Sequence, residues 1–197
     1  DIWYKNILNE EMARIAVGGV SATLMVHGIA LPPLINYASE AIKQEIVPPV
    51  LAGSKRISLA ITEPAAGSDV AQLQTTARLE GDHYVVNGSK TYITGGMNAN
   101  WYTTAVRTGG EGSEGVSALL IPADLAGVSR TALNRKQGWW CSDTATIYFD
   151  DVRVPKENLV GDENRGFRVI MTNFNAERLA MSAAMEAYSR VCLEDAV

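Results

Sequence analysis

The chain has 197 residues, 47% of them hydrophobic and 20% charged, a composition typical of one medium folded domain or two small ones. The formal net charge of −5, with scattered Lys and Arg, argues against nucleic acid or a membrane surface as a partner, because both attract clustered positive charge. No apolar run reaches the roughly 18 to 20 residues of a membrane span. Cys141 and Cys192 lie far apart without metal-ligand spacing, so we interpret them as buried or idle thiols and expect no metal site.

The first part of the chain has a helical pattern. Apolar or small residues at helical spacing predict one buried helix from Asn6 to Leu31: Ile7, Leu8, Met12, Ile15, Ala16, Gly19, Val20 and Thr23. Pro32-Pro33 should stop this helix, and Ser39 should begin a shorter one that ends at Pro48-Pro49. We therefore expect a helical segment over residues 1–52.

Beyond Gly53 the pattern alternates with a period of two. Short alternating runs predict strands around Ile57–Ile61 and at 75–79, 84–87, 91–94, 102–107, 116–121, 128–133 and 145–149. Because turn residues rather than helices separate nearly all of them, residues 53–163 are predicted to form an antiparallel barrel or sandwich, which makes the fold class α+β. No Gly-x-Gly-x-x-Gly motif follows a strand, which disfavours a Rossmann site.

Residues 164–197 return to helical spacing, with a carboxylate in the middle of an apolar stripe. The stripe consists of Phe167, Ile170, Phe174, Glu177, Met181, Ala184 and Tyr188. Arg178 lies about 100° around the helix from Glu177, so the two cannot simply pair. Desolvating an unpaired carboxylate is costly or raises its pKa, which makes Glu177 a candidate functional residue. The alternatives are a solvated stripe edge or a basic partner on another helix.

The turn after the first predicted strand is the most specific stretch of the sequence. Ala60–Asp69 reads Ala-Ile-Thr-Glu-Pro-Ala-Ala-Gly-Ser-Asp, so the strand breaks at Pro64 and Gly67 permits unusual backbone conformations. Successive amides around Gly67 and Ser68 can form an anion-binding concavity, beside which Thr62 and Ser68 supply hydroxyls. On local composition alone, an ordinary capped hairpin turn is an equally good interpretation.

This turn resembles the Thr-Glu-Pro-x-x-Gly-Ser-Asp signature of the acyl-CoA dehydrogenase family, although Gln72 stands where the family usually has a small residue. Further blocks resemble the family in the same order: 47–53, 87–90, 92–96 with 100–102, 138–139 with 142–144, 149–155 with 158–161, and 174–179. The resemblance implies an interior fragment with the end of an N-terminal helical domain, a middle β domain, and the first helix, within 164–197, of a four-helix bundle.

The resemblance also implies the chemistry, which is FAD-dependent α,β-dehydrogenation of an acyl-CoA thioester, with α-proton abstraction and β-hydride transfer to flavin N5. Glu177 matches the catalytic base of isovaleryl- and long-chain-type members, whereas most members take their base from a later helix. Arg178 and Ser68 would contact the coenzyme A substrate. The residues expected to hold FAD are Ala60, Ile61, Thr62, Ser68, Tyr92, Ile93 and Thr94. Tyr92 could instead be a core aromatic, and we interpret Glu63 and Asp69 as groups that fix the turn.

As partners, the resemblance implies an electron-transfer flavoprotein and further copies of the chain in a tetramer or dimer. It implies a location in the bacterial cytoplasm or, in a eukaryote, the mitochondrial matrix, and a fragment that is inactive alone. Two other functions remain open. One is a flavin oxidase or monooxygenase on the same fold. The other is a non-catalytic β-sandwich binding module, which would leave the matched blocks unexplained.

Overall fold

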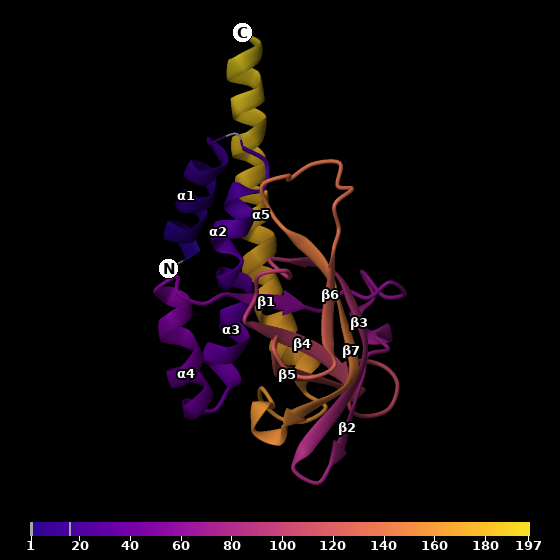
Figure 1. Cartoon of the computed structure of the whole chain (residues 1–197). Helices are drawn as coiled ribbons and strands as arrows, with labels where there is room; N and C mark the ends of the chain where they lie inside the picture. The colour runs from indigo at the N-terminus through magenta and orange to yellow at the C-terminus, as the bar shows by residue number, and fades with distance from the viewer. Residues whose placement is uncertain (1, 16) are drawn as a thin grey trace.

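The structure is a computed structural model that describes residues 2–15 and 17–197, with side chains from Trp3 onward. Four N-terminal helices lie on one side of the long helix α5 and a curled sheet lies on the other (Figure 1). The helices are α1 (Ile2–Ala13), α2 (Val20–Met25), α3 (His27–Tyr37), α4 (Glu40–Leu51) and α5 (Gly166–Ala196). The C-terminal end of α5 extends beyond the rest of the chain in this view.

The predicted single helix over residues 6–31 is wrong, because the chain forms α1, α2 and the start of α3 there. Gly19 precedes α2 in the left-handed conformation, with φ 97°, which interrupts the helical backbone. Ala16, which the apolar pattern included, lies outside the described residues.

The prediction that prolines end the first helices is also wrong. Pro32-Pro33 lie inside α3 and Pro48-Pro49 lie inside α4. Packing outweighs the low helical propensity of these prolines. Leu34, Ile46 and Val50 from the two helices are buried in one cluster with residues of the sheet. The predicted start of α4 is confirmed, because the Ser39 hydroxyl accepts a hydrogen bond from the Ile42 amide at 3.4 Å.

The middle of the chain forms a seven-stranded sheet. Its strands are β1 (Ile57–Ala60), β2 (Thr76–Glu80), β3 (His83–Thr94), β4 (Trp101–Arg107), β5 (Val116–Pro122), β6 (Val128–Ala132) and β7 (Thr144–Pro155). Six of them follow the order β1-β4-β2-β3-β7-β6, and β5 pairs with β4. All the predicted strands are present, but the runs 84–87 and 91–94 belong to one strand, β3, which has register shifts on both sides of residues 88–90.

The sheet is mixed, so the prediction of a purely antiparallel sheet is wrong. Strand β1 pairs with β4 in parallel, with Ile57 opposite Trp101, and β2 meets β4 in parallel at Thr76 and Arg107. Alternation of apolar residues indicates which side chains face a core, but it carries no information on the direction of a partner strand. The remaining pairings are antiparallel.

Three buried clusters hold the fold together. The first lies within the sheet domain and includes Tyr102 and Ile147, and the second lies between α3, α4 and the sheet. The third joins Ile170 of α5 to Ala105 and Val116 of the sheet and also contains Ile61, so the beginning of α5 is fixed beside the Ala60–Asp69 turn. Among the described residues, no helix is long and apolar enough to cross a membrane. Cys141 and Cys192 are both exposed rather than buried.

Candidate active site

A cavity of about 260 Å³ lies between the middle of α5 and the N-terminal helices. One wall consists of the α5 residues Glu177, Ala180, Met181, Ala184, Met185 and Tyr188. Helices α1 to α3 supply the opposite wall, and Thr94 at the end of β3 and Trp139 complete it. The C-terminal half of the predicted apolar stripe therefore lines a cavity, whereas Ile170 in its first half packs against the sheet.

Glu177 is the carboxylate of this cavity. Its Oε2 atom is buried and has no hydrogen-bond partner among the described residues. Burial raises the pKa of Glu177 above its usual value, and the positive charges of Lys5 and Arg178 only partly oppose this effect. The two cations do not form an ion pair with Glu177 in the described part of the chain. A desolvated, unpaired carboxylate beside an apolar space is suited to accept a proton from a bound molecule.

Arg178 lies away from the cavity, although it follows Glu177 in the sequence. Its side chain is exposed and its guanidinium carbon lies 5.9 Å from the centre of the Phe174 ring. This position agrees with the turn of about 100° that separates successive helical residues. Contact between Arg178 and coenzyme A stays a prediction.

The two segments expected to hold FAD lie side by side. The Thr91 amide donates a hydrogen bond to the Thr62 carbonyl at 2.8 Å, which joins the end of β1 to β3. Thr94, three residues further along β3, lines the cavity that contains Glu177. The structure thus brings Thr62, Thr94 and Glu177 into one region, although they are far apart in the sequence.

Three of the residues expected to bind the cofactor have buried side chains, so only their backbone atoms could contact a ligand. The side chains of Ala60 and Ile93 belong to the core inside the sheet, and that of Ile61 belongs to the cluster beneath α5. Thr62 and Thr94 are half-buried, so their hydroxyls are accessible from outside the core. Polar contacts to a bound group from these segments would therefore come from backbone atoms and from the two threonines.

The turn after β1 is fixed by backbone hydrogen bonds and leaves free amides. Glu63 and Ala66 exchange hydrogen bonds of 2.9 and 3.2 Å, which close the turn. Gly67 and Ser68 are exposed, and within the described part of the chain their amides have no protein acceptor. Phosphate binding by these two amides and the Ser68 hydroxyl stays a prediction, because neither Gly67 nor Ser68 has the positive φ of an amide concavity. Ser68 does not line the cavity that contains Glu177.

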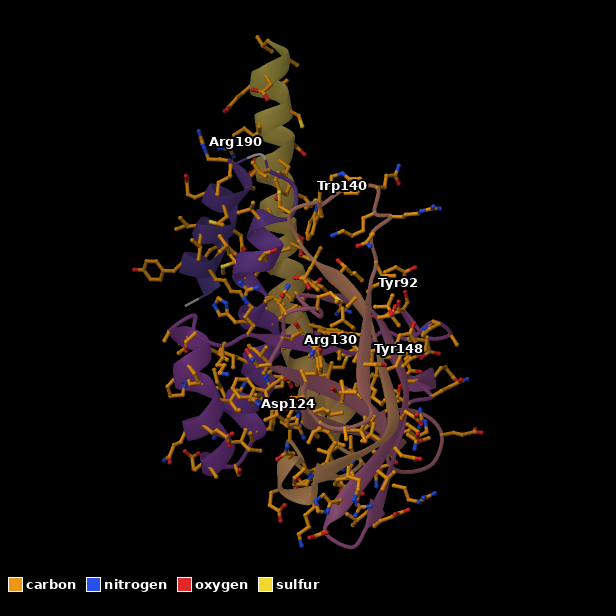
Figure 2. All side chains as sticks on the ribbon, viewed as in Figure 1. Tyr92, Asp124, Arg130, Trp140, Tyr148 and Arg190 are labelled. Atoms are coloured by element: carbon orange, nitrogen blue, oxygen red, sulfur yellow. The ribbon has the colours of Figure 1, made fainter. Side chains whose placement is uncertain are left out.

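Tyr92 is not a core aromatic. It has φ 57° at the register shift between Lys90 and Ile93, and 70% of its side chain is exposed. An irregularity of this kind redirects a side chain out of the regular alternation of a strand. In Figure 2 its side chain lies at the outer surface of the sheet. This leaves the Tyr92 ring free to pack against a bound group.

Trp139 lines the cavity, although no role was predicted for it from the sequence. It lies on the loop between β6 and β7, the loop on which Figure 2 labels Trp140, and this loop approaches α2. The Cys141 amide donates to the Gly18 carbonyl at 3.1 Å, and the Thr23 hydroxyl donates to the Cys141 carbonyl at 3.0 Å. These contacts fix the loop over the cavity. Gly138-Trp139 belonged to a block matched to the family, but nothing in its pattern indicated contact with the N-terminal helices.

Fold and site together define a helix–sheet–helix protein in which a carboxylate lines an apolar cavity and an exposed turn with free amides follows the first strand. The sequence matches two family descriptions: "Acyl-CoA dehydrogenase, N-terminal domain" over residues 1–54 and "Acyl-CoA dehydrogenase, middle domain" over residues 58–152. The chain belongs to the acyl-CoA dehydrogenase family.

Individual relatives agree with this assignment. An acyl-CoA dehydrogenase of Alternaria alternata is 44% identical over all of the chain and 45% of its own length. The crystal structure of a probable acyl-CoA dehydrogenase from Mycobacterium abscessus has 48% identity and a TM-score of 0.93 over 96% of the chain and 50% of its own. An acyl-CoA dehydrogenase from Bacillus anthracis, solved in complex with FAD, has 34% identity and a TM-score of 0.85, over 92% of the chain and 32% of its own. The chain spans about half the length of the curated relatives it matches.

Proposed function

We propose that the whole protein is an FAD-dependent acyl-CoA dehydrogenase in which Glu177 removes the α-proton of the acyl thioester. The observation that carries the proposal is the unpaired Oε2 atom of Glu177, buried at the wall of an apolar cavity. A structural carboxylate would normally be hydrogen-bonded when buried. Glu177 lines a cavity that can take an apolar acyl chain, while its Oε2 atom has no hydrogen-bond partner among the described residues.

The cavity residues would act on the substrate in two ways. The apolar side chains Met25, Ile29 and Met181 would surround the acyl chain and exclude water from it. Exclusion of water strengthens the affinity of Glu177 for a proton, which favours removal of the weakly acidic α-proton. Glu177 would hold that proton until the product leaves.

The turn after β1 and the end of β3 are the segments that would hold FAD. The free amides of Gly67 and Ser68 suit its phosphates, and the accessible Thr62 and Thr94 hydroxyls, with Tyr92, suit its ring system. When bound, FAD would accept the hydride that leaves the β-carbon of the acyl group. An electron-transfer flavoprotein as the next acceptor and assembly into a dimer or tetramer are part of the same proposal.

The test is an anaerobic titration of the purified, FAD-loaded whole protein with acyl-CoA thioesters of different length and branching. The proposal expects at least one thioester to bleach the visible flavin absorbance and to be converted to the 2-enoyl-CoA. Admission of oxygen separates the alternatives, because an oxidase would turn over with stoichiometric hydrogen peroxide. A protein that binds no FAD, or whose flavin no thioester reduces, would contradict the proposal.

A further inference from the structure

The buried lysine of β3 lies beside the proposed flavin segment and is not used by the proposed reaction. Lys90 has no exposed surface, and its Nζ atom donates to Glu63 Oε1 at 2.6 Å and to the Ile61 carbonyl at 3.1 Å. A buried ammonium is costly unless it is paired and hydrogen-bonded. Both acceptors of Lys90 belong to the segment that follows β1. The burial of the ammonium is therefore offset only while this short segment keeps its geometry.

Glu63 is held in its ionised form by the surrounding groups. Its carboxylate also accepts hydrogen bonds from the amides of Gln74, at 2.6 Å, and Thr75, at 2.9 Å. Burial alone would raise the pKa of Glu63, but Lys90 and these hydrogen bonds outweigh burial and lower it. The carboxylate is therefore a fixed anchor that ties the start of the turn to β3 and to the chain before β2.

The ion pair determines how the peptide between Ile61 and Thr62 is oriented. Lys90 holds the Ile61 carbonyl, and in a planar trans peptide the Thr62 amide points in the opposite direction. The next carbonyl, that of Thr62, is held by the Thr91 amide at 2.8 Å. The Thr62 amide itself has no acceptor within the part of the chain that the structure describes. Two consecutive peptides are thus fixed with one free donor directed away from Lys90.

We propose that Lys90 is a positioning residue for the flavin-binding segment 60–62, where its pair with Glu63 orients the amide of Thr62 toward the bound cofactor. The inference rests on the proposed FAD site. Lys90 would not touch FAD, because its ammonium is directed at Ile61 and Glu63.

The first test compares FAD affinity in the whole protein. Lys90→Met removes the donor to Ile61 and is expected to raise the dissociation constant of FAD about tenfold, the equivalent of one well-made hydrogen bond. Val86→Ala is the matched control, because Val86 is fully buried in the same strand and lies in the core inside the sheet. At temperatures where both variants are folded, the control should bind FAD as the unmodified protein does. Unchanged FAD affinity in Lys90→Met would overturn the proposal.

A second measurement needs no flavin. Hydrogen exchange of the Thr91 amide reports its bond to Thr62, and Lys90→Met should speed this exchange more than Val86→Ala does. Equal exchange in the two variants would reject Lys90 as the positioning residue and leave the FAD proposal untouched. Failure of the unmodified whole protein to bind FAD would instead reject the proposed function.

The third measurement uses the unmodified protein and covers the case in which Lys90→Met does not fold. Burial lowers the pKa of Lys90 to about 8, with Glu63 opposing this shift and Arg107 adding to it. Raising the pH from 7 to 9 should therefore weaken FAD binding, because the ammonium that pairs with Glu63 loses its proton. The Lys90→Met/Glu63→Gln variant, which lacks both charges, should bind weakly at either pH. FAD affinity that is independent of pH in the unmodified protein, or tight binding by the double variant, would contradict the proposal.

Discussion

Replacing Glu177 by Gln tests whether the cavity desolvates its carboxylate. The change keeps the shape of the side chain and removes the charge. Because burial raises the pKa of Glu177, the ionised form is less stable in the folded chain than in the unfolded one. The stability linked to this group is fully present below the unfolded pKa, near 4.5, and is lost as the pH rises through the folded value. At neutral pH the variant should therefore be more stable than the unmodified chain.

The expected gain in stability of the Glu177→Gln variant is limited by the partial exposure of Glu177. Each unit of pKa elevation corresponds to about 1.4 kcal/mol, but solvent screens a half-buried group, so a gain on the order of 1 kcal/mol is expected. For a chain of this size that gain corresponds to about 2–4 °C in melting temperature. Calorimetry at several pH values measures it, and the difference should shrink toward zero near pH 4.

Glu186→Gln is the matched control on the same helix. Glu186 is exposed and pairs with Arg190 at 2.6 Å, so its replacement should lower stability by no more than about 0.5 kcal/mol. The reasoning would be refuted if Glu177→Gln lowered the melting temperature at pH 7, or if its effect did not depend on pH.

Two other predictions concern the contacts that shape the cavity. Gly19→Ala would place a Cβ atom 2.8 Å from the Ser142 amide and the Trp139 carbonyl, at φ 97°. Gly53 has φ 73° but open space around it, so Gly53→Ala is the control. Gly19→Ala should lower the free energy of unfolding by about 1–3 kcal/mol more than Gly53→Ala does. Equal melting temperatures for these two variants would show that the loop between β6 and β7 is not in close contact with Gly19. Thr103→Val removes the donor to the Ala30 carbonyl at 2.9 Å, so it should destabilise by about 1–3 kcal/mol through the unsatisfied carbonyl, measured by urea unfolding. A loss below about 0.5 kcal/mol would contradict the importance of this link between α3 and β4.

The sequence predicted the strands well because short apolar runs bounded by turn residues are typical of strands, whether one face is buried or, as in β4 and β5, both. It did not predict that β1 runs parallel to β4, since the pairing of strands distant in the sequence leaves no local pattern. The prolines of α3 and α4 were misleading for a related reason, because a buried interface with the sheet outweighs their local preference.

Sequence reasoning could single out a candidate residue where that residue was locally anomalous, and its catalytic role stays a prediction. Glu177 was recognisable because a carboxylate interrupts an apolar helical stripe. Lys5 and Trp139 were not recognised, because a lysine on a surface-like helix and a tryptophan in a loop are common features. Their place in the cavity depends on how α1 and the loop between β6 and β7 pack against α5, which only the tertiary structure contains.

The most direct test of the central claim is the anaerobic rate of flavin reduction by an acyl-CoA substrate in the whole protein, compared among the unmodified form, Glu177→Gln and Glu186→Gln. If Glu177 is the base, its replacement lowers the rate by about 10²–10⁴-fold while FAD and the thioester still bind, and Glu186→Gln reduces flavin at the unmodified rate. An unmodified rate in Glu177→Gln would contradict the claim and locate the base elsewhere in the protein.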